Sequence, residues 1–353
     1  MDFDAFAAAI QGHAAIKKKL VIHDVLKILA DNKFNSTHVF KSIGEDAAAV
    51  EVEGGTLVLV ATDMVSSEFV KRAPYSAGYS AILVCVDDIF ACGGVPMTAA
   101  IDVQAATDAV LHELVKGAKK AAEQLGISIT RGHTSLKEGG DAISCTVVGQ
   151  HASKADFVSA GDARPGQVLV LVWDGNGKRS PNGPYWDTVT FKTTEEVRKH
   201  RALMVELAGS PLYERATEHL RASPRERLIH ASKDVSDAGF FGTAMMFANY
   251  SRVGFEIEER LLFEAFSVDN YEDLLWFTTA YLTTAFLVTI DDRSIYNVQR
   301  RAIGSGMQAA VIGRVVPGSN IHVVHEGKSR LLLDWRETPI FPDDVFKNSR
   351  DGV

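Results

Sequence analysis

The sequence is poor in the features that mark secreted and membrane proteins. It has three cysteines among 353 residues, Cys85, Cys92 and Cys145, scattered in apolar segments without the spacing of a zinc site. No apolar run approaches the roughly 18–20 residues of a membrane span. The first residues, MDFDAFAAAIQGH, lack the basic segment of a signal peptide. We therefore expect a cytoplasmic protein with reduced cysteines and no membrane partner.

Basic residues are not in excess either. The 37 Lys and Arg residues stand against 45 Asp and Glu, and the formal net charge is −8. Because phosphate backbones attract basic patches, this balance disfavours nucleic acid as a main partner. The sequence also contains no G-x-S-x-G, H-E-x-x-H or Walker motif. An acidic protein can still bind ATP when Mg²⁺ bridges the two negative partners.

The length and the order of patterns predict two domains. At 353 residues the chain exceeds the size at which one hydrophobic core stops growing. Residues 151–166 read as a linker, so we expect an N-terminal domain over 1–155 and a C-terminal domain over 156–353. Strands that alternate with helices indicate an α/β unit. The expected elements are strands 56–61, 97–103, 127–130, 142–148 and 168–173, and helices 76–91, 107–125, 194–208 and 211–222.

Three acidic positions lie at the ends of expected elements. Asp46 is in the turn SIGEDAAAV, Asp63 follows the strand over 56–61, and Asp88 closes the helix over 76–91. A single Asp in such a place is commonly a cap or a turn former. Three carboxylates in one ordered pattern also suit a hard cation such as Mg²⁺. We predict that these three hold Mg²⁺, with Asp87 behind them.

Three later segments offer further polar groups. RGHT, residues 131–134, reads as a turn at a strand end that either contacts phosphate through its backbone N–H groups or is simply exposed. DVSDAG, with Asp234 and Asp237, opens a helix and is either a cap or an anion site. The loop over 174–187 is rich in Gly, Pro and Asn, and Lys178 and Arg179 are candidate anion binders within it.

These motifs, taken in order, resemble those of the AIR-synthase-related proteins, the superfamily of aminoimidazole ribonucleotide (AIR) synthetases. GEDAAAV, ATDM and DVSDAG are similar to GDDAAV, STDM and DVSDGL of thiamine-monophosphate kinases. CVDDIFACGGVPM resembles CVNDI…GAEP of AIR synthetases and LSDIAAMGG.P of selenophosphate synthetases. RGHT is similar to the GGHT of selenophosphate synthetases. The resemblance spans roughly residues 40–320.

The resemblance implies a two-domain AIR-synthase-like fold of the α/β (α+β) class, in which the N-terminal sheets of a homodimer meet in a barrel-like interface. It implies ATP and Mg²⁺ as cofactors and a small-molecule substrate. It also implies a mobile N-terminal arm, in which His13 and Lys17 act in catalysis together with His133. The positions implied to contact the nucleotide are Gly44, Asp46, Thr62, Asp63, Gly132, Thr134, Asp234 and Asp237.

The activity implied is ATP-dependent phosphoryl transfer, which asks a protein mainly for positioning and charge neutralisation. The member of the family stays open. The arm has no cysteine, against the Cys-dependent route to selenophosphate, and TDMVSSEF stands where AIR synthetases carry D-G-V-G-T-K. Our leading interpretation is an enzyme acting on an unidentified small metabolite. The alternatives are a kinase like those for thiamine monophosphate or selenophosphate, and a nucleotide-binding or scaffold protein without turnover.

Overall fold

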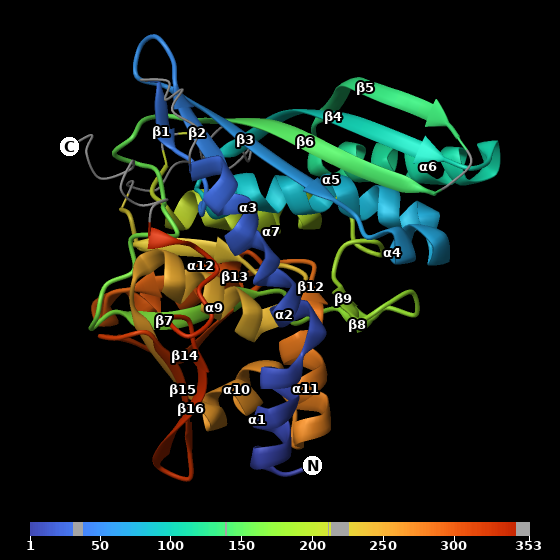
Figure 1. Ribbon diagram of the computed structural model, residues 1–353. Coiled ribbons are helices and arrows are strands. Elements are labelled where there is room, and N and C mark those ends of the chain that lie inside the picture. The colour runs from blue at the N-terminus through green and yellow to red at the C-terminus, as the bar shows by residue number, and fades with distance from the viewer. Residues whose placement is uncertain (31–37, 138–139, 211, 213–225, 344–353) are drawn as a thin grey trace.

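Two large sheets stand one above the other, with helices between them and along one flank (Figure 1). The computed structural model describes residues 1–30, 38–137, 140–210, 212 and 226–343 of the chain. The first sheet is built before residue 152, and the second begins with the strand at Val168. The predicted two-domain fold of mixed α and β content is therefore confirmed.

The first sheet has six strands, and one of its faces is covered by two long helices. All neighbouring strands are antiparallel except β4 and β5. Alternate residues of β3 are buried against the helices α5 (Pro74–Ala91) and α6 (Asp108–Leu125), while the others point away. The strand order is β1 (Val39–Lys41), β2 (Ala48–Glu51), β3 (Leu57–Met64), β6 (Ala142–His151), β4 (Val95–Ala105) and β5 (Ser128–Leu136).

The second sheet has seven strands, which are antiparallel except for the pair β11 and β15. The helix–strand alternation along the chain therefore does not produce the parallel sheet typical of α/β units. The strand order is β10 (Ala231–Asp234), β13 (Ala285–Ile290), β7 (Val168–Trp173), β14 (Gln308–Val316), β11 (Gly254–Glu258), β15 (Asn320–His325) and β16 (Lys328–Asp334). A small sheet joins β12 (Tyr281–Leu282), β9 (Tyr185–Asp187) and β8 (Lys178–Arg179).

Strand β7 is buried on both faces and divides the interior into two hydrophobic cores. Val168, Val170 and Val172 belong to the first core, which also contains α5 and the first sheet. Leu169 and Leu171 belong to the second core, on the other side of the sheet. This position explains why VLVLVW is a continuous apolar run and not an alternating one. The helices around the second sheet are α7 (Thr194–Leu207), α9 (Gly239–Ser251), α10 (Glu259–Phe266), α11 (Tyr271–Thr279) and α12 (Ile295–Gly304), with the short η1 (Asp292–Ser294).

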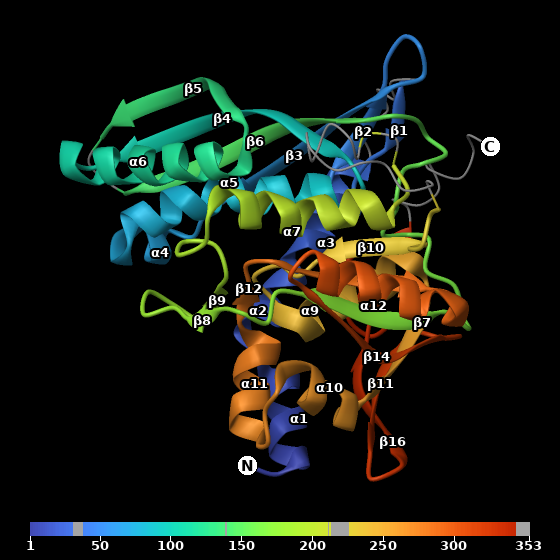
Figure 2. The same cartoon turned by 180° about the vertical axis from the view of Figure 1, so that it is seen from behind.

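Helix α5 lies between the two sheets, together with α7 (Figure 2). It packs closely on α6 because two glycines lie at the contact. A Cβ at Gly78 would lie 1.9 Å from the carbonyl oxygen of Leu114, and one at Gly117 would lie 1.9 Å from that of Tyr75. No larger residue fits at either position without moving the helices apart. A short helix, α4 (Ser67–Arg72), precedes α5.

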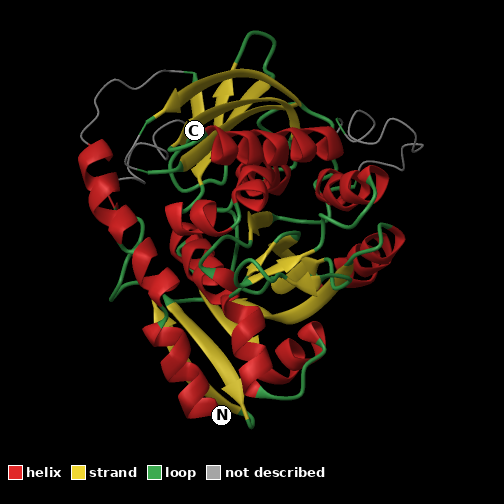
Figure 3. Cartoon of the chain, turned by 90° about the vertical axis from the view of Figure 1, so that its right-hand side faces the viewer, coloured by secondary structure: helices red, strands yellow, loops and turns green. Residues whose placement is uncertain are grey.

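Three helices at the N-terminus, α1 (Phe3–Gly12), α2 (Ala14–Lys19) and α3 (Val21–Ala30), run along one flank of the molecule (Figure 3). The aromatic side chains of α1 are buried in the second core, where the ring centre of Phe6 lies 6.1 Å from that of Phe241. The segment that the sequence groups with the N-terminal domain thus packs on the C-terminal one. Among the described helices, none is long and apolar enough to cross a membrane.

Most of the expected elements are found close to their expected places. The predicted helix over 107–125 is α6, which begins after the N-cap Thr107 and ends at Gly126 with φ +73°. The strand over 168–173 is β7. The helix expected over 211–222 lies outside the described residues except for Leu212.

A buried ion pair joins the two domains. Arg201 on α7 is 0% exposed, and its Nε lies 2.7 Å from the Asp87 carboxylate on α5. The same guanidinium donates to the carbonyl oxygen of Thr283 at 2.9 Å and to the Thr284 hydroxyl at 3.2 Å. Burial raises the pKa of Asp87 to about 6, although Arg201 acts against this rise. The pair therefore fixes α5 against the second domain.

Replacing Arg201 by Met leaves Asp87 buried without its partner. Removing one member of a buried ion pair typically costs about 3–5 kcal/mol, and we expect that loss in the free energy of unfolding measured with urea. The double variant Asp87→Leu/Arg201→Met should recover much of it. The matched control is Arg314→Met, which breaks an exposed pair with Asp292 and should cost at most about 1 kcal/mol. Equal losses in Arg201→Met and Arg314→Met would contradict the assignment.

The stability of the protein should also depend on pH through His151, at the end of β6. The side chain is 0% exposed, and burial lowers its pKa to about 4. The unfolded chain binds this proton below about pH 6.5, whereas the folded protein does not until about pH 4. The buried, neutral His151 therefore does not lower the free energy of unfolding above pH 6.5. Below this pH it lowers the free energy of unfolding progressively, by about 2 kcal/mol at pH 5. Urea unfolding at pH 7.5 and 5.0 should show a smaller pH dependence in His151→Leu than in wild type, and equal slopes would refute the prediction.

Candidate functional site

Three carboxylates from separate segments meet between the two domains. Asp46 follows the turn before β2, Asp88 is on α5, and Asp234 ends β10. One oxygen from each lies within 4.8 Å of the others. The backbone N–H of Asp234 also donates to Asp46 at 3.2 Å. We call Asp46, Asp88 and Asp234 the carboxylate cluster.

The cluster includes two of the three predicted metal ligands. Asp234, for which the sequence predicts a nucleotide contact, takes the third place. Asp63 lines the same cavity but lies outside the cluster, and its carboxylate accepts a hydrogen bond from the Met64 N–H at 2.6 Å. Asp87 faces Arg201 and is not directed at the cluster.

A buried lysine that the sequence analysis did not single out lies in contact with the cluster. The ammonium of Lys233 forms an ion pair with Asp46 and lies 3.9 Å from Asp234 Oδ1. The Lys233 side chain is 6% exposed and that of Asp46 is 1% exposed. Burial and the neighbouring carboxylates raise the pKa of both Asp88 and Asp234 well above the usual value. The only signal in the sequence is a charged Lys233 directly before Asp234, in a short strand that is buried throughout.

The cluster forms part of the wall of a cavity of about 580 Å³, a size typical of small-molecule sites. Segments of both domains line it: α2, the turn before β2, the end of β3, α4, α5, the loop before β9, β10 and the start of β12. Its polar lining residues are His13, Lys19, Glu45, Asp46, Asp63, Ser66, Glu68, Arg72, Ser80, Asp88, Asn182, Tyr185, Lys233, Asp234, Ser236, Asp237, Thr279 and Tyr281.

The N-terminal arm contributes one of its two predicted residues, His13, to the cavity, and Lys19 in place of the predicted Lys17. His13 lines the cavity, and burial lowers its pKa. Lys17 is exposed and does not line it, whereas Lys19 does and forms an ion pair with Asp237 at 2.6 Å. Residues two apart in a helix point to different sides, so only one of these two lysines can face the cavity.

Several other predicted contacts lie away from the cavity. The turn predicted for RGHT is wrong, because Gly132, His133 and Thr134 lie within β5, where pairing with β4 supplies the backbone hydrogen bonds. All three residues are exposed at the edge of the sheet, and none of them lines the cavity. Thr62 donates instead to the Cys145 carbonyl at 3.0 Å. Gly44, at φ +107°, lies so near the Tyr250 ring that a Cβ would approach it to 2.1 Å.

The loop over 174–187 reaches the cavity through its tip and not through its basic residues. Asn182, Gly183, Pro184 and Tyr185 line the cavity. The ammonium of Lys178 lies 4.4 Å from the centre of the Phe191 ring. Arg179 forms an ion pair with Asp273 and stacks on Trp276 at 4.4 Å. These two basic residues thus have structural partners.

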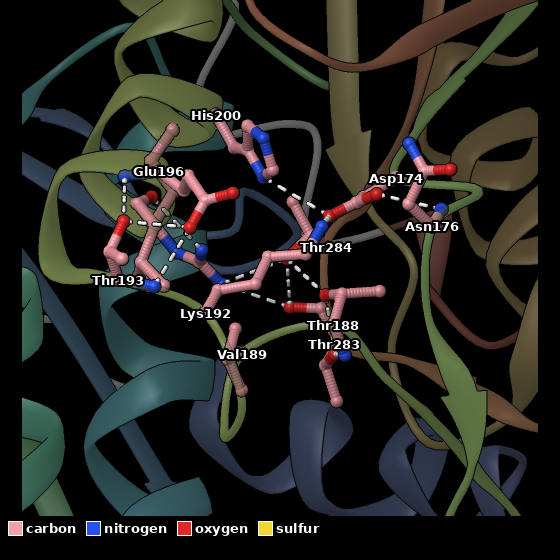
Figure 4. A network of polar contacts seen from close by, with 12 residues as sticks. Asp174, Asn176, Thr188, Val189, Lys192, Thr193, Glu196, His200, Thr283 and Thr284 are labelled. Carbon is pink, nitrogen blue, oxygen red and sulfur yellow. Dashed lines mark hydrogen bonds and ion pairs between the residues drawn. The ribbon is translucent and has the colours of Figure 1, made fainter.

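A second buried charge network lies beside the interdomain ion pair (Figure 4). The Asp174 carboxylate is fully buried, forms an ion pair with Lys192 and lies 3.1 Å from His200 Nδ1. Burial acts to raise the pKa of Asp174, but hydrogen bonds from His200 and Lys192 outweigh it and lower the pKa. Here one carboxylate is satisfied by several donors, in contrast to the carboxylate cluster.

Comparison with known proteins agrees with this architecture. The model named "AIR synthase related protein, N-terminal domain" matches residues 44–151, and its C-terminal counterpart matches residues 164–326. Uncharacterized protein sll0787 of Synechocystis sp. is 28% identical over 299 residues, which are 84% of this chain and 85% of that protein.

Two solved structures share the fold. T. maritima PurL complexed with ATP superposes with a TM-score of 0.64 at 12% identity, over 87% of this chain and 50% of the PurL chain, so this chain spans about half of that protein. AaThiL complexed with AMPPCP and TMP has a TM-score of 0.56 at 23% identity, over 87% and 93% of the two chains. Since the two family models together match most of the sequence, the chain belongs to the AIR synthase related family.

Proposed function

We propose that the protein is an ATP-dependent and Mg²⁺-dependent phosphoryl-transfer enzyme that acts on a small metabolite in the interdomain cavity. The observation that carries this proposal is the carboxylate cluster, whose oxygens lie within 4.8 Å of one another in the cavity wall. Phosphoryl transfer depends on positioning and on neutralising charge. The polar lining of the cavity consists mostly of charged side chains of both signs, which suits that requirement.

The residues of the cluster fit a magnesium ion. Carboxylate oxygens are the hard ligands that Mg²⁺ prefers, and it is usually held by one or two carboxylates together with substrate phosphates. Asp46, Asp88 and Asp234 would hold it, and the bound ion would neutralise charge on the transferring phosphoryl group. Asp63 lines the same cavity and is available to a second ion or to metal-bound water.

Cationic side chains around the cavity would orient the nucleotide. Lys19 and Arg72 line it from α2 and α4. His13 lies on the same wall as Lys19, and its lowered pKa keeps it neutral near pH 7, where it can accept a proton. Two proteins with this fold, PurL and AaThiL, were solved with ATP and with AMPPCP, which supports assigning the cavity to a nucleotide.

Binding of Mg·ATP should depend on the cluster more than on the rest of the cavity. Asp234→Asn keeps the shape but removes one anionic ligand, and losing one charged contact costs about 1.5–3 kcal/mol, roughly ten- to a hundredfold in affinity. Glu68→Gln is the matched control, since it removes a carboxylate that lines the same cavity outside the cluster. We expect calorimetry to show the larger loss for Asp234→Asn. An unchanged affinity in Asp234→Asn would overturn the metal assignment.

Turnover separates an enzyme from a binding protein that keeps the fold. Metabolites that co-purify with the protein, identified by mass spectrometry, would supply candidate substrates. We expect wild type to hydrolyse or transfer the γ-phosphate of ATP when such a substrate and Mg²⁺ are both present, and Asp46→Asn to lose this activity while remaining folded. Binding of Mg·ATP without any turnover across these substrates would favour the binding protein.

We further propose a cytoplasmic homodimer that pairs through the open face of the first sheet. On β3, Val60 is 36% exposed on the side away from the helices. The three cysteines are buried and unpaired, as in a reducing compartment. Light scattering at micromolar concentration should give twice the 38.4 kDa chain mass. Val60→Lys should shift it to the monomer, and a monomeric wild type would refute the dimer.

A further inference from the structure

The carboxylate cluster already contains a cation that belongs to the protein. The ammonium of Lys233 is in contact with Asp46 Oδ1 and 3.9 Å from Asp234 Oδ1. The other oxygen of Asp46 accepts the backbone N–H of Asp234 at 3.2 Å. Both oxygens of Asp46 are therefore engaged, and one of them is engaged by a positive charge that a metal ion would have to share or displace.

The charge balance around Lys233 differs from that of the other buried lysine. Lys192 faces one carboxylate, Asp174. This carboxylate also contacts His200 and accepts a hydrogen bond from the Asn176 N–H. Lys233 faces the three carboxylates of the cluster, which together carry −3 when ionised against its +1. The cluster thus attracts further positive charge, although the Lys233 ammonium already occupies one oxygen of Asp46.

Other cations that line the cavity are engaged elsewhere. Lys19 pairs with Asp237, whose side chain is 75% exposed. Arg72 donates to the Asn182 carbonyl at 3.3 Å. Among the described residues that line the cavity, Lys233 is thus the basic side chain in contact with the cluster.

We propose that Lys233 competes with the divalent metal for Asp46 and so makes metal binding depend on the nucleotide. Without nucleotide the ammonium stays on Asp46, and the metal binds weakly. A triphosphate in the cavity offers the ammonium another anionic partner, which its flexible four-carbon stem can reach, and Asp46 is then free for the metal. Because such coupling is reciprocal, the metal strengthens nucleotide binding by the same factor. The inference rests on the proposed function, since the metal site is the one described there.

The test measures Mn²⁺ binding to the full chain by electron paramagnetic resonance of the free ion. Mn²⁺ accepts the same oxygen ligands as Mg²⁺. Lys233→Met removes the competing charge and keeps the volume of the side chain. We expect it to bind Mn²⁺ without nucleotide about tenfold more tightly than wild type, which corresponds to about 1.4 kcal/mol. Lys192→Met, which removes the other buried lysine, should bind Mn²⁺ as wild type does, and Lys233→Arg should keep the weak binding.

The second arm of the test adds AMPPCP. In wild type the analogue should strengthen Mn²⁺ binding markedly, and in Lys233→Met it should do so much less. Equal or weaker Mn²⁺ binding in Lys233→Met than in wild type, without nucleotide, overturns the role of Lys233 while leaving the metal site intact. If wild type with AMPPCP and Lys233→Met alone both fail to bind Mn²⁺, the metal site of the proposed function fails as well.

Removing Lys233 leaves uncompensated carboxylates, so folding is followed in parallel by thermal melting. We expect Mn²⁺ to raise the melting temperature of Lys233→Met more than that of wild type, because at a given concentration a ligand that binds more tightly stabilises the folded state more. Lys233→Gln removes the charge but keeps a hydrogen-bond donor to Asp46, so it should destabilise the fold less than Lys233→Met. Its melting temperature with and without Mn²⁺ is compared with that of wild type in the same way. If both variants are unfolded without metal, refolding on addition of Mn²⁺ supports the proposal, and failure to refold counts against it.

Discussion

Repulsion between three closely spaced carboxylates, Asp46, Asp88 and Asp234, is the constraint on which the rest of the molecule depends. Their oxygens lie within 4.8 Å, and like charges at this separation cannot all ionise without positive charge nearby. The raised pKa of Asp88 and of Asp234 expresses that cost. Asp46 and Asp234 come from different domains, so this repulsion acts across the contact between the domains, and a cation between the carboxylates relieves it. Lys233 provides one such charge, and the cavity leaves room for more.

Helix α5 carries residues of both the carboxylate cluster and the ion pair between the domains. Asp87 and Asp88 are neighbours in sequence, but successive residues of a helix point about 100° apart. Asp87 therefore faces Arg201 on α7, while Asp88 faces Asp46 and Asp234. The close contact with α6 at Gly78 leaves the helix no freedom to turn. The ion pair between the domains and the carboxylate cluster are thus set by a single rigid element.

The elements that could be predicted from the sequence are those whose pattern is local. The apolar run of β7 and the capped, amphipathic α6 carry their own signals, and Asp46 and Asp88 stand out as acids at element ends. The place of Asp234 in the cluster could not be predicted, because it depends on how two domains meet. RGHT contains turn-forming residues, yet pairing with β4 outweighs that local preference and continues the strand. The choice between Lys17 and Lys19 depended on helix phase, which sequence spacing in a short basic run does not reveal.

The turn that opens α9 connects the carboxylate cluster to the N-terminal arm. Asp234 at one side of this turn belongs to the cluster, and Asp237 at the other holds Lys19. That pair is largely exposed at Asp237, and exposed ion pairs contribute at most about 1 kcal/mol. The arm is therefore held mainly by the aromatic side chains of α1, such as Phe6, which are buried in the second core. With the arm anchored in this way, Lys19 can leave Asp237 for an anion in the cavity at little cost, and the arm need not unfold or move as a whole.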